Sequence, residues 1–125
     1  MGDARHDLGI AAEAAVAAWL EGRGWVVLGR RVRSPGGGEV DLVALDPGRC
    51  LVAIEVRARR TARTGIGSEP VDPRRTARTG RTLVAFAAGN GIDHRALRID
   101  LVSVMPEPGD AATWRLRRIP DIGAW

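Results

Sequence analysis

Two short stretches in the first half of the chain alternate apolar and polar positions with a period of two. They cover residues 39–45 and 51–57, and both are rich in β-branched residues. Between them lies the five-residue segment 46–50, which contains a proline and a glycine. Two such runs joined by a short link of turn-forming residues predict a β-hairpin. If the link closes residue 45 against residue 51, the register of the whole hairpin is fixed.

The predicted hairpin has two different faces, because successive side chains of a strand point to opposite sides. One face is wholly apolar and carries Val40, Leu42, Ala44, Val52, Ile54 and Val56. The other is apolar near the turn, with Val43, Leu45, Leu51 and Ala53, and charged at its open end. There the register places Asp41 opposite Glu55 and Glu39 opposite Arg57. Like charges directly opposite each other destabilise a sheet, so the two acids need a compensating cation. Arg57 is one candidate, and a divalent metal held by carboxylate oxygens is the other.

The remaining chain predicts two helices and three further strands. Leu8, Ala11, Ala12, Ala15, Val16, Trp19 and Leu20 follow helical spacing, and Gly22 and Gly24 end that helix. Asp72 and Pro73 are a helix-start signal for a second helix that runs to about residue 88. Alternation predicts strands over 25–32, 97–104 and 114–119, the last at a sheet edge, with loops or turns at 33–38, 61–70 and 106–112. The expected fold is α/β, with a mixed central sheet of about five strands flanked by helices in the order αβββαββ.

Length and composition predict one soluble domain over residues 1–125. The chain is 45% hydrophobic and 27% charged, as in ordinary globular proteins. No apolar stretch is long enough to span a bilayer, and no signal peptide is visible, so we expect a cytoplasmic protein without a membrane partner. Cys50 is the single cysteine, which excludes an internal disulfide and any cysteine-rich zinc site.

Positive charge is concentrated after the hairpin. The net charge is +4, and all 19 basic residues are arginines. Residues 57–81 contain eight arginines against Glu69 and Asp72. Such a run is often only a solvated loop and helix face. Beside a pair of carboxylates, it favours contact with a phosphate backbone.

At this point the residues match a known family. Glu39-Val40-Asp41, then thirteen residues, then Glu55-Val56-Arg57 resembles the metal-binding core of the PD-(D/E)xK nuclease superfamily. More narrowly, residues 9–13, 36–42, 54–59, 71–75 and 98–102 look like the small bacterial YraN-like family of predicted endonucleases. The resemblance implies a restriction-endonuclease-like three-layer sandwich, similar also to archaeal Holliday junction resolvases.

The resemblance also implies a site. Asp41 and Glu55 would bind Mg²⁺ (or Mn²⁺), with the backbone carbonyl of Val56 as a third ligand. Asp41, Glu55, Arg57 and Glu13 would be the catalytic residues, although periodicity alone makes Glu13 a solvated residue beside the apolar stripe of its helix. Glu39 would be an outer or structural partner of Arg57.

The chain departs from the family pattern at informative positions. Arginine stands at 57 and at 75, where relatives usually have lysine, and Val40 replaces the proline of the superfamily's name. Arginine cannot be deprotonated in a protein, so Arg57 cannot take a proton from an attacking water. It can hold a phosphate and stabilise negative charge in a transition state.

Three functions follow. The first is a metal-dependent endonuclease that hydrolyses phosphodiesters of DNA, with structured or branched DNA among the candidates. The arginines that would contact the backbone are Arg59, Arg60, Arg63, Arg74, Arg75 and Arg78. The second is a non-catalytic nucleic-acid-binding protein on a nuclease fold. The third is a partner-binding protein, with a homodimer formed through Trp114 and the last strand.

Overall fold

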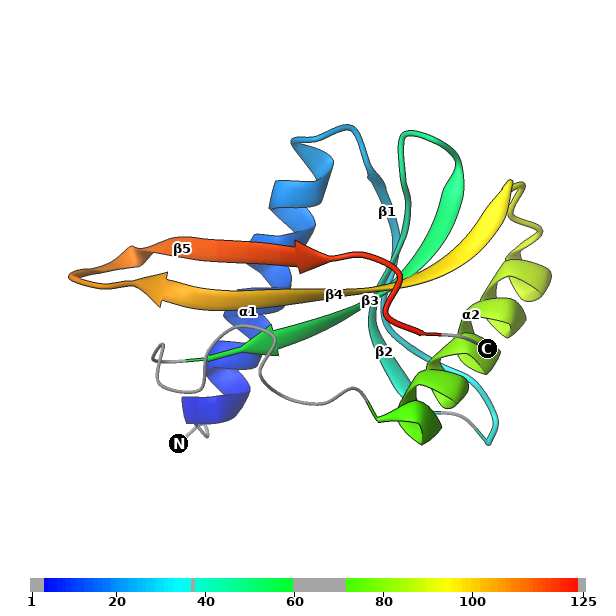
Figure 1. Ribbon diagram of the computed structural model, residues 1–125, viewed down its shortest axis with the longest axis horizontal. Helices are drawn as coiled ribbons and strands as arrows, with labels where there is room; N and C mark the ends of the chain where they lie inside the picture. Colours follow the sequence, from blue (N-terminus) through cyan, green and yellow to red (C-terminus); the bar gives the residue numbers. More distant parts are fainter. Residues whose placement is uncertain (1–3, 37, 60–71, 124–125) are drawn as a thin grey trace.

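The computed structural model describes residues 4–36, 38–59 and 72–123, which form two helices and five strands (Figure 1). In chain order these are α1 (Ala4–Glu21), β1 (Val26–Arg33), β2 (Glu39–Leu45), β3 (Cys50–Ala58), α2 (Pro73–Asn90), β4 (Ala96–Glu107) and β5 (Asp110–Ile119). The order αβββαββ is the predicted one. The predicted loop at 61–70 lies outside the described residues.

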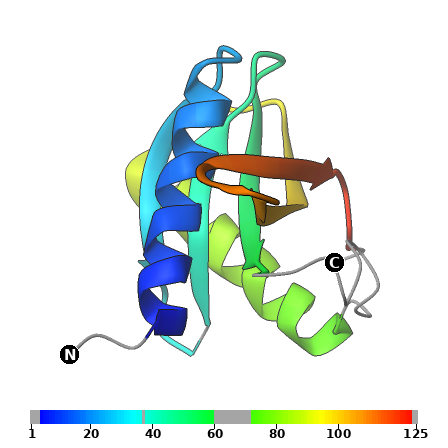
Figure 2. The same cartoon turned by 90° about the vertical axis from the view of Figure 1, so that its left-hand side faces the viewer.

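One mixed sheet joins all five strands in the spatial order β1-β2-β3-β4-β5. Only β3 and β4 are parallel; the other three neighbouring pairs are antiparallel. Helix α2 lies between β3 and β4 in the chain, as a parallel connection requires. The two helices cover opposite faces of the sheet (Figures 1 and 2), which confirms the predicted three-layer α/β sandwich.

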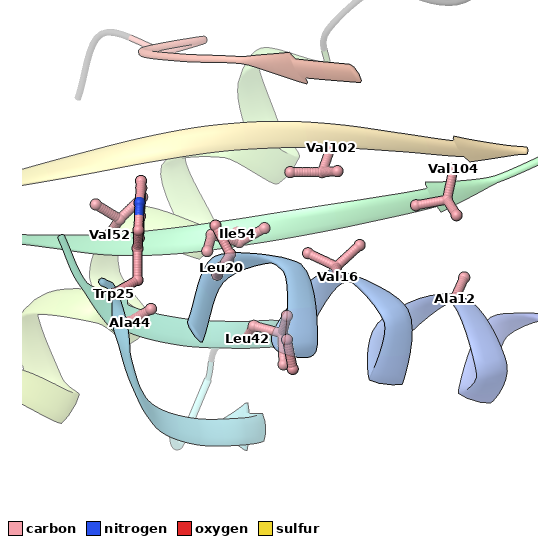
Figure 3. Close-up of a cluster of buried hydrophobic side chains, with 11 residues drawn as sticks. Ala12, Val16, Leu20, Trp25, Leu42, Ala44, Val52, Ile54, Val102 and Val104 are labelled. Atoms are coloured by element: carbon pink, nitrogen blue, oxygen red, sulfur yellow. The ribbon is translucent and has the colours of Figure 1, made fainter. Parts of the chain in front are cut away.

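Helix α1 covers one face because its small and branched residues recur at helical spacing. Ala12, Val16, Ala17 and Leu20 are fully buried (Figure 3). They pack on Trp25 and on side chains of the three central strands. These strand residues are Leu42, Ala44, Val52, Ile54, Val102 and Val104. This cluster holds the apolar face predicted for the hairpin, with the exception of Val40.

Helix α2 covers the other face and begins and ends where the sequence predicts. Asp72 is its N-cap, and the Oδ1 of Asp72 accepts the N–H of Arg74 at 3.0 Å. Gly91 ends it with φ 60°, the left-handed conformation that favours glycine. The helix continues unbroken through its buried Gly80. Its buried residues Leu83 and Ala87 belong to the second cluster. The strand residues of this cluster are Val40, Val43, Leu51, Ala53 and Ile99. Val40 therefore lies in the cluster under α2, and its predicted face was wrong.

The hairpin register is the predicted one near the turn and fails at the open end. Pairs run from Leu45–Leu51 to Leu42–Ile54. The ladder does not reach the predicted pairs of Asp41 with Glu55 and of residue 39 with residue 57. Instead, the Oδ2 of Asp41 accepts the N–H of Val56 at 2.8 Å, so a side chain takes the place of a backbone acceptor.

The last hairpin is longer than predicted. Strands β4 and β5 extend to Glu107 and Asp110, which pair across a turn that contains Gly109 with φ 80°. The predicted turn over 106–112 is therefore only about two residues long, since its flanks belong to the strands. Strand β5 lies at an edge of the sheet, as predicted.

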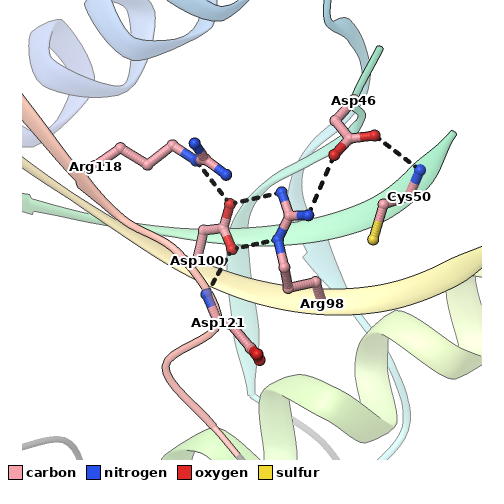
Figure 4. A network of polar contacts seen from close by, with 6 residues as sticks. All are labelled: Asp46, Cys50, Arg98, Asp100, Arg118 and Asp121. Carbon is pink, nitrogen blue, oxygen red and sulfur yellow. Dashed lines mark hydrogen bonds and ion pairs between the residues drawn. The ribbon is translucent and has the colours of Figure 1, made fainter. Parts of the chain in front are cut away.

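A buried ion cluster ties β4, β5 and the hairpin turn together (Figure 4). Asp100 is fully buried. Its two oxygens accept hydrogen bonds from the Nε and Nη2 of Arg98, the Nε of Arg118 and the N–H of Asp121, at 2.8–3.1 Å. Hydrogen bonding to Asp100 raises the pKa of Arg98. Arg98 also reaches Asp46, whose other oxygen accepts the N–H that begins β3.

Trp25 completes this cluster on its apolar side. The guanidinium carbons of Arg118 and Arg98 lie 5.2 and 5.9 Å from the centre of the Trp25 ring. Both contacts fall within the range of cation–π attraction. The charges at Asp100 are therefore enclosed by matched partners.

Among the described residues, neither helix is long and apolar enough to cross a bilayer.

Candidate functional site

Asp41 is the half-buried acid at the open end of the β2–β3 hairpin. Burial raises its pKa from 3.8 to about 6, although the hydrogen bond from the N–H of Val56 lowers it. The nearby carboxylates of Glu13 and Glu55 raise the pKa further, and the guanidinium of Arg75 lowers it. The pKa of Asp41 is therefore raised chiefly because its carboxyl group is withdrawn from water, and the neighbouring acids add to this effect.

Glu55 is more deeply buried, on the neighbouring strand β3, with 7% of its side chain exposed. Its Oε1 accepts the Nε of Arg75 at 3.0 Å and the hydroxyl of Thr79 at 3.4 Å. Both donors come from the first half of α2. The structure thus brings Asp41, Glu55 and Arg75 together, as the sequence predicts for the first two.

Each of these two acids keeps one oxygen without a hydrogen-bond donor from the described residues. Asp41 uses Oδ2 and Glu55 uses Oε1, which leaves Oδ1 and Oε2. Two carboxylates with available oxygens form a donor set that suits Mg²⁺, which usually takes one or two carboxylates and completes its shell with water and phosphate. The residues present therefore fit the metal that the resemblance implies.

The same part of the chain holds no larger metal-ligand cluster. Within residues 4–36, 38–59 and 72–123, no three His, Cys, Asp or Glu side chains gather closely enough to hold a metal ion. Any Mg²⁺ at this place would depend on two carboxylates, with a backbone oxygen, water and phosphate as its other ligands.

A polar cavity of about 360 Å³ opens beside Asp41. Its lining consists of Gly38, Glu39, Asp41, Arg75, Arg78 and Thr79. One water occupies about 30 Å³ of liquid, so the cavity has room for a phosphate group and several waters. Acidic and basic side chains meet in this cavity, with the acids on the strands and the arginines on α2.

Glu13 approaches the cluster from α1, on the other side of the sheet. Its Oε2 accepts the Nε of Arg31 at 3.3 Å. Its charge acts on Asp41, which places it close to that acid. Glu13 is thus a paired and largely buried residue, with 18% of its side chain exposed.

Arg31 has an unusual backbone at this point of β1. The register runs from Arg30–Leu42 to Val32–Val40, so Arg31 lies at the level of Asp41. Its φ of 49° is in the left-handed region, which costs a non-glycine residue roughly 1 kcal/mol or more. Residues opposite each other in neighbouring strands ordinarily share a face. The left-handed conformation of Arg31 interrupts the alternation of side chains along β1. The side chain of Arg31 contacts Glu13 of α1.

Arg57 and Val56, two other predicted site residues, lie on β3 with Glu55, and Glu39 lies on β2. Arg57 is partly buried and follows Glu55 by two residues, so the two side chains leave β3 on the same face. The N–H of Val56 binds Asp41, and its side chain packs against the cluster under α1. Glu39, expected beside Arg57, accepts the Nε and Nη2 of Arg33 at 2.9 and 2.7 Å.

The structure describes four of the six predicted phosphate-binding arginines. Arg74, Arg75 and Arg78 are exposed on the first turns of α2. Arg59 follows β3, and its N–H donates to the carbonyl of Val104 at 2.8 Å. The predictions for Arg60 and Arg63 fall outside the described residues.

Sequence reasoning missed two residues of this site. Thr79 is buried and follows Arg75 by four positions, which places the two side chains on one face of a helix. That spacing was a usable signal. No sequence pattern indicated Arg31. A left-handed backbone conformation cannot be predicted from sequence at a residue that is neither glycine nor asparagine.

Fold and site together define the class: an α/β sandwich with a carboxylate pair that faces an arginine-bearing helix. The chain belongs to UPF0102, described as an uncharacterised protein family, whose sequence profile matches residues 12–104. This confirms the predicted membership of the YraN-like family. Every predicted site residue lies within the matched region.

Three relatives illustrate the range of similarity. The UPF0102 protein of Deinococcus radiodurans is 40% identical over 110 residues, which cover 87% of this chain and 86% of the relative. That of Anaeromyxobacter dehalogenans is 42% identical over 103 residues, 82% and 75% of the two chains. A third, from Leifsonia xyli, is 35% identical over 103 residues, 81% and 84% of the two chains.

Proposed function

We propose that this UPF0102 protein is a Mg²⁺-dependent endonuclease that hydrolyses phosphodiester bonds of DNA. One observation carries the proposal. Asp41 and Glu55 lie near each other, each with one oxygen that no described residue donates to, and Asp41 lines a polar cavity together with Arg75 and Arg78. Carboxylates that bind a hard cation and arginines that bind phosphate are the two requirements of metal-assisted phosphodiester hydrolysis.

Asp41 and Glu55, with the backbone carbonyl of Val56, are the proposed ligands of Mg²⁺ or Mn²⁺. A bound divalent ion lowers the pKa of water and neutralises charge that develops on a phosphate. Glu13 adds negative charge to the same place, since its carboxylate acts on Asp41. The role of these residues is to hold their oxygens in position before the substrate arrives.

Arg57 serves as an electrostatic group in this proposal. Its guanidinium stays protonated, so it donates hydrogen bonds and never accepts the proton of the nucleophile. It follows Glu55 by two residues on β3, and this spacing on one face of the strand supports its assignment to the site. Hydrogen bonds from a guanidinium to a phosphate oxygen favour the transition state, in which negative charge on the phosphoryl oxygens increases.

The exposed arginines of α2 bind the rest of the substrate. Arg74, Arg75 and Arg78 project from the first turns of a helix whose N-terminus carries partial positive charge. Contacts of this kind go to phosphates and position a nucleic acid without distinguishing its bases. We therefore expect little sequence preference and strong salt dependence.

The second candidate is a nucleic-acid-binding protein without turnover, and Arg57 is the observation that favours it. Without a lysine at this position, the protein lacks a group there that can release and accept a proton. In that case the basic surface of α2 remains, and the carboxylate pair contributes little to binding.

A cleavage assay separates the two functions. Linear, nicked and branched DNA are incubated with the protein in Mg²⁺ and in Mn²⁺, and cleavage is followed on denaturing gels. Asp41→Asn and Glu55→Gln should each reduce cleavage at least about a hundredfold, because each removes a ligand charge. Glu21→Gln, at the exposed end of α1, is the matched control. No metal-dependent cleavage by the parent on any substrate, with DNA retention intact in both site variants, would establish the non-catalytic alternative.

A further inference from the structure

Glu13, Asp41 and Glu55 form the carboxylate cluster of the candidate site. Two of these acids form an ion pair with an arginine, and the two arginines belong to different elements, β1 and α2. Glu13 of α1 pairs with Arg31 of β1 at 3.3 Å, and Glu55 pairs with Arg75 of α2 at 3.0 Å. Asp41 feels the charge of both acids and of Arg75, and its recorded hydrogen bond comes from the N–H of Val56. In the cluster, Glu13 and Glu55 are thus the acids with a recorded arginine ion pair.

Both pairs are asymmetric in burial. The acid side chains are 18% and 7% exposed, for Glu13 and Glu55 respectively. The side chains of their partners Arg31 and Arg75 are 44% and 57% exposed. The acids are therefore fixed by packing, while each arginine is a long side chain that reaches in from solvent.

Each of these arginines contacts its acid through Nε alone. Among the described residues, the hydrogen bond of Arg31 to Glu13 and that of Arg75 to Glu55 each use Nε and no terminal nitrogen. Arg33 and Arg115 differ, since each uses Nε and Nη2 on a single glutamate. A contact through one nitrogen is easier to break than a two-nitrogen one, and it leaves planar donor groups suited to phosphate.

We propose that Arg31 and Arg75 are built-in counter-ions of the carboxylate cluster, which a divalent cation displaces and which then bind phosphates of the nucleic acid. The inference rests on the proposed metal-dependent function and deepens it. It adds Arg31, which no sequence pattern indicated, to the site residues. It also gives Arg75 two alternate partners, Glu55 and a phosphate.

The physical basis is competition for the same negative charge. In Arg75–Glu55, the guanidinium occupies Oε1 of an acid that would also bind the cation. Two cations close to one carboxylate repel each other, so entry of the divalent ion weakens the guanidinium contact. The released arginine remains tethered beside the cavity, where an incoming phosphate provides the next anion.

If the arginines compete with the cation, replacing them should change the affinity for the cation and the affinity for DNA in opposite directions. Replacing Arg31 or Arg75 with glutamine removes a competitor, so binding of the cation becomes tighter. The same replacement removes a phosphate partner, so binding of DNA becomes weaker. A residue with a purely structural role weakens both, because both need the folded site.

The experiment uses the full chain, with Mg²⁺ and Mn²⁺ as probes and no DNA in the first arm. Calorimetric titration should give a dissociation constant about fivefold lower for Arg31→Gln and Arg75→Gln than for the parent, the size of a partly exposed ion pair. The second arm measures retention of a labelled DNA duplex at several salt concentrations. Both variants should bind more weakly, with a salt slope reduced by about one.

Substitutions of two nearby arginines outside the ion pairs test whether loss of any positive charge has the same effect. Arg30→Gln changes the neighbouring exposed arginine of β1, and Arg81→Gln changes an exposed arginine of α2 outside the Asp41 cavity. Neither should change the affinity for the cation. Arg75→Lys restores the positive charge and should return both affinities toward those of the parent.

The possible outcomes distinguish this inference from the function on which it rests. If the parent binds the cation and both glutamine variants bind it equally well or more weakly, the counter-ion role is wrong and the proposed metal site stands. If the parent binds no divalent cation, both are overturned. Circular dichroism of each variant shows that a change in affinity does not reflect loss of fold.

Discussion

Two acids of the sheet, the buried Asp100 and the half-buried Asp41, differ in how their charge is matched. Asp100 is fully buried, and its oxygens receive four hydrogen bonds, three of them from two arginines. Asp41 is less buried, receives one backbone N–H, and has two other acids nearby. The two acids therefore differ more in their recorded hydrogen-bond donors and ion pairs than burial alone suggests, and we propose Asp41 as the functional one.

The raised pKa of Asp41, which results mainly from burial, has an energetic consequence. A pKa raised from 3.8 to about 6 corresponds to roughly 3 kcal/mol of unfavourable free energy for the ionised form in the folded protein. A bound cation would relieve this cost. Natural sites often retain destabilising features of this kind because function requires them.

The largest expected effect comes from breaking the matched cluster. Asp100→Asn leaves Arg98 and Arg118 without their buried carboxylate, and loss of one partner in such a group costs about 3–5 kcal/mol. The free energy of unfolding, from urea titration at pH 7, should fall by this amount. A loss below 1 kcal/mol would mean that the cluster is not the stabilising feature described above.

The next effect has the opposite sign and depends on pH. Asp41→Asn removes the ionisation cost, while its amide oxygen still accepts the N–H of Val56, so the variant should be more stable than the parent at pH 7 by up to about 3 kcal/mol. The sign follows from proton binding. Between pH 3.8 and about 6 the folded parent binds more protons than the unfolded chain, so its stability falls as pH rises through this window.

The advantage of Asp41→Asn should therefore grow from pH 4 to pH 6.5 and then remain constant. Urea titrations across this range, in buffers without divalent cations, measure it. Glu21→Gln is the matched control, and its stability difference from the parent should show no such growth. A variant less stable than the parent at pH 7 would show that Asp41 is adequately compensated.

A smaller effect is expected at Thr79, which donates its hydroxyl to Glu55. Thr79→Val keeps the shape of this buried side chain but removes the donor, at a cost of about 1 kcal/mol in unfolding free energy. It should also weaken binding of Mn²⁺, because Glu55 is held less firmly. Thr113→Val, which removes an exposed hydroxyl donor to Asp110 on β5, serves as its control and should leave the binding of Mn²⁺ unchanged.

Much of the fold could be predicted from local patterns. Helical spacing of small apolar residues located α1, and the Asp72–Pro73 start signal located the beginning of α2. The turn residues at 46–50 set the hairpin register near the turn, and strand alternation then brought Asp41 and Glu55 to one place. These features depend on neighbours in sequence, which is why the sequence reveals them.

The parts that were missed depend on contacts between distant segments. Asp100 looked like a polar residue in an alternating strand, and only the approach of Arg118 and Asp121 makes it a buried ionic centre. The side chain of Asp41 replaces a backbone acceptor for Val56, which no alternation rule foresees. The left-handed Arg31 likewise follows from its tertiary contact with Glu13.

We propose that the carboxylates of Asp41 and Glu55 share a divalent cation. Crystals of the protein grown with Mn²⁺, with data collected near the manganese absorption edge, would locate the ion. We expect one anomalous peak between these two carboxylates, and its loss in Asp41→Asn. Ordered carboxylates without a peak between them, or a peak only elsewhere on the protein, would rule out this site.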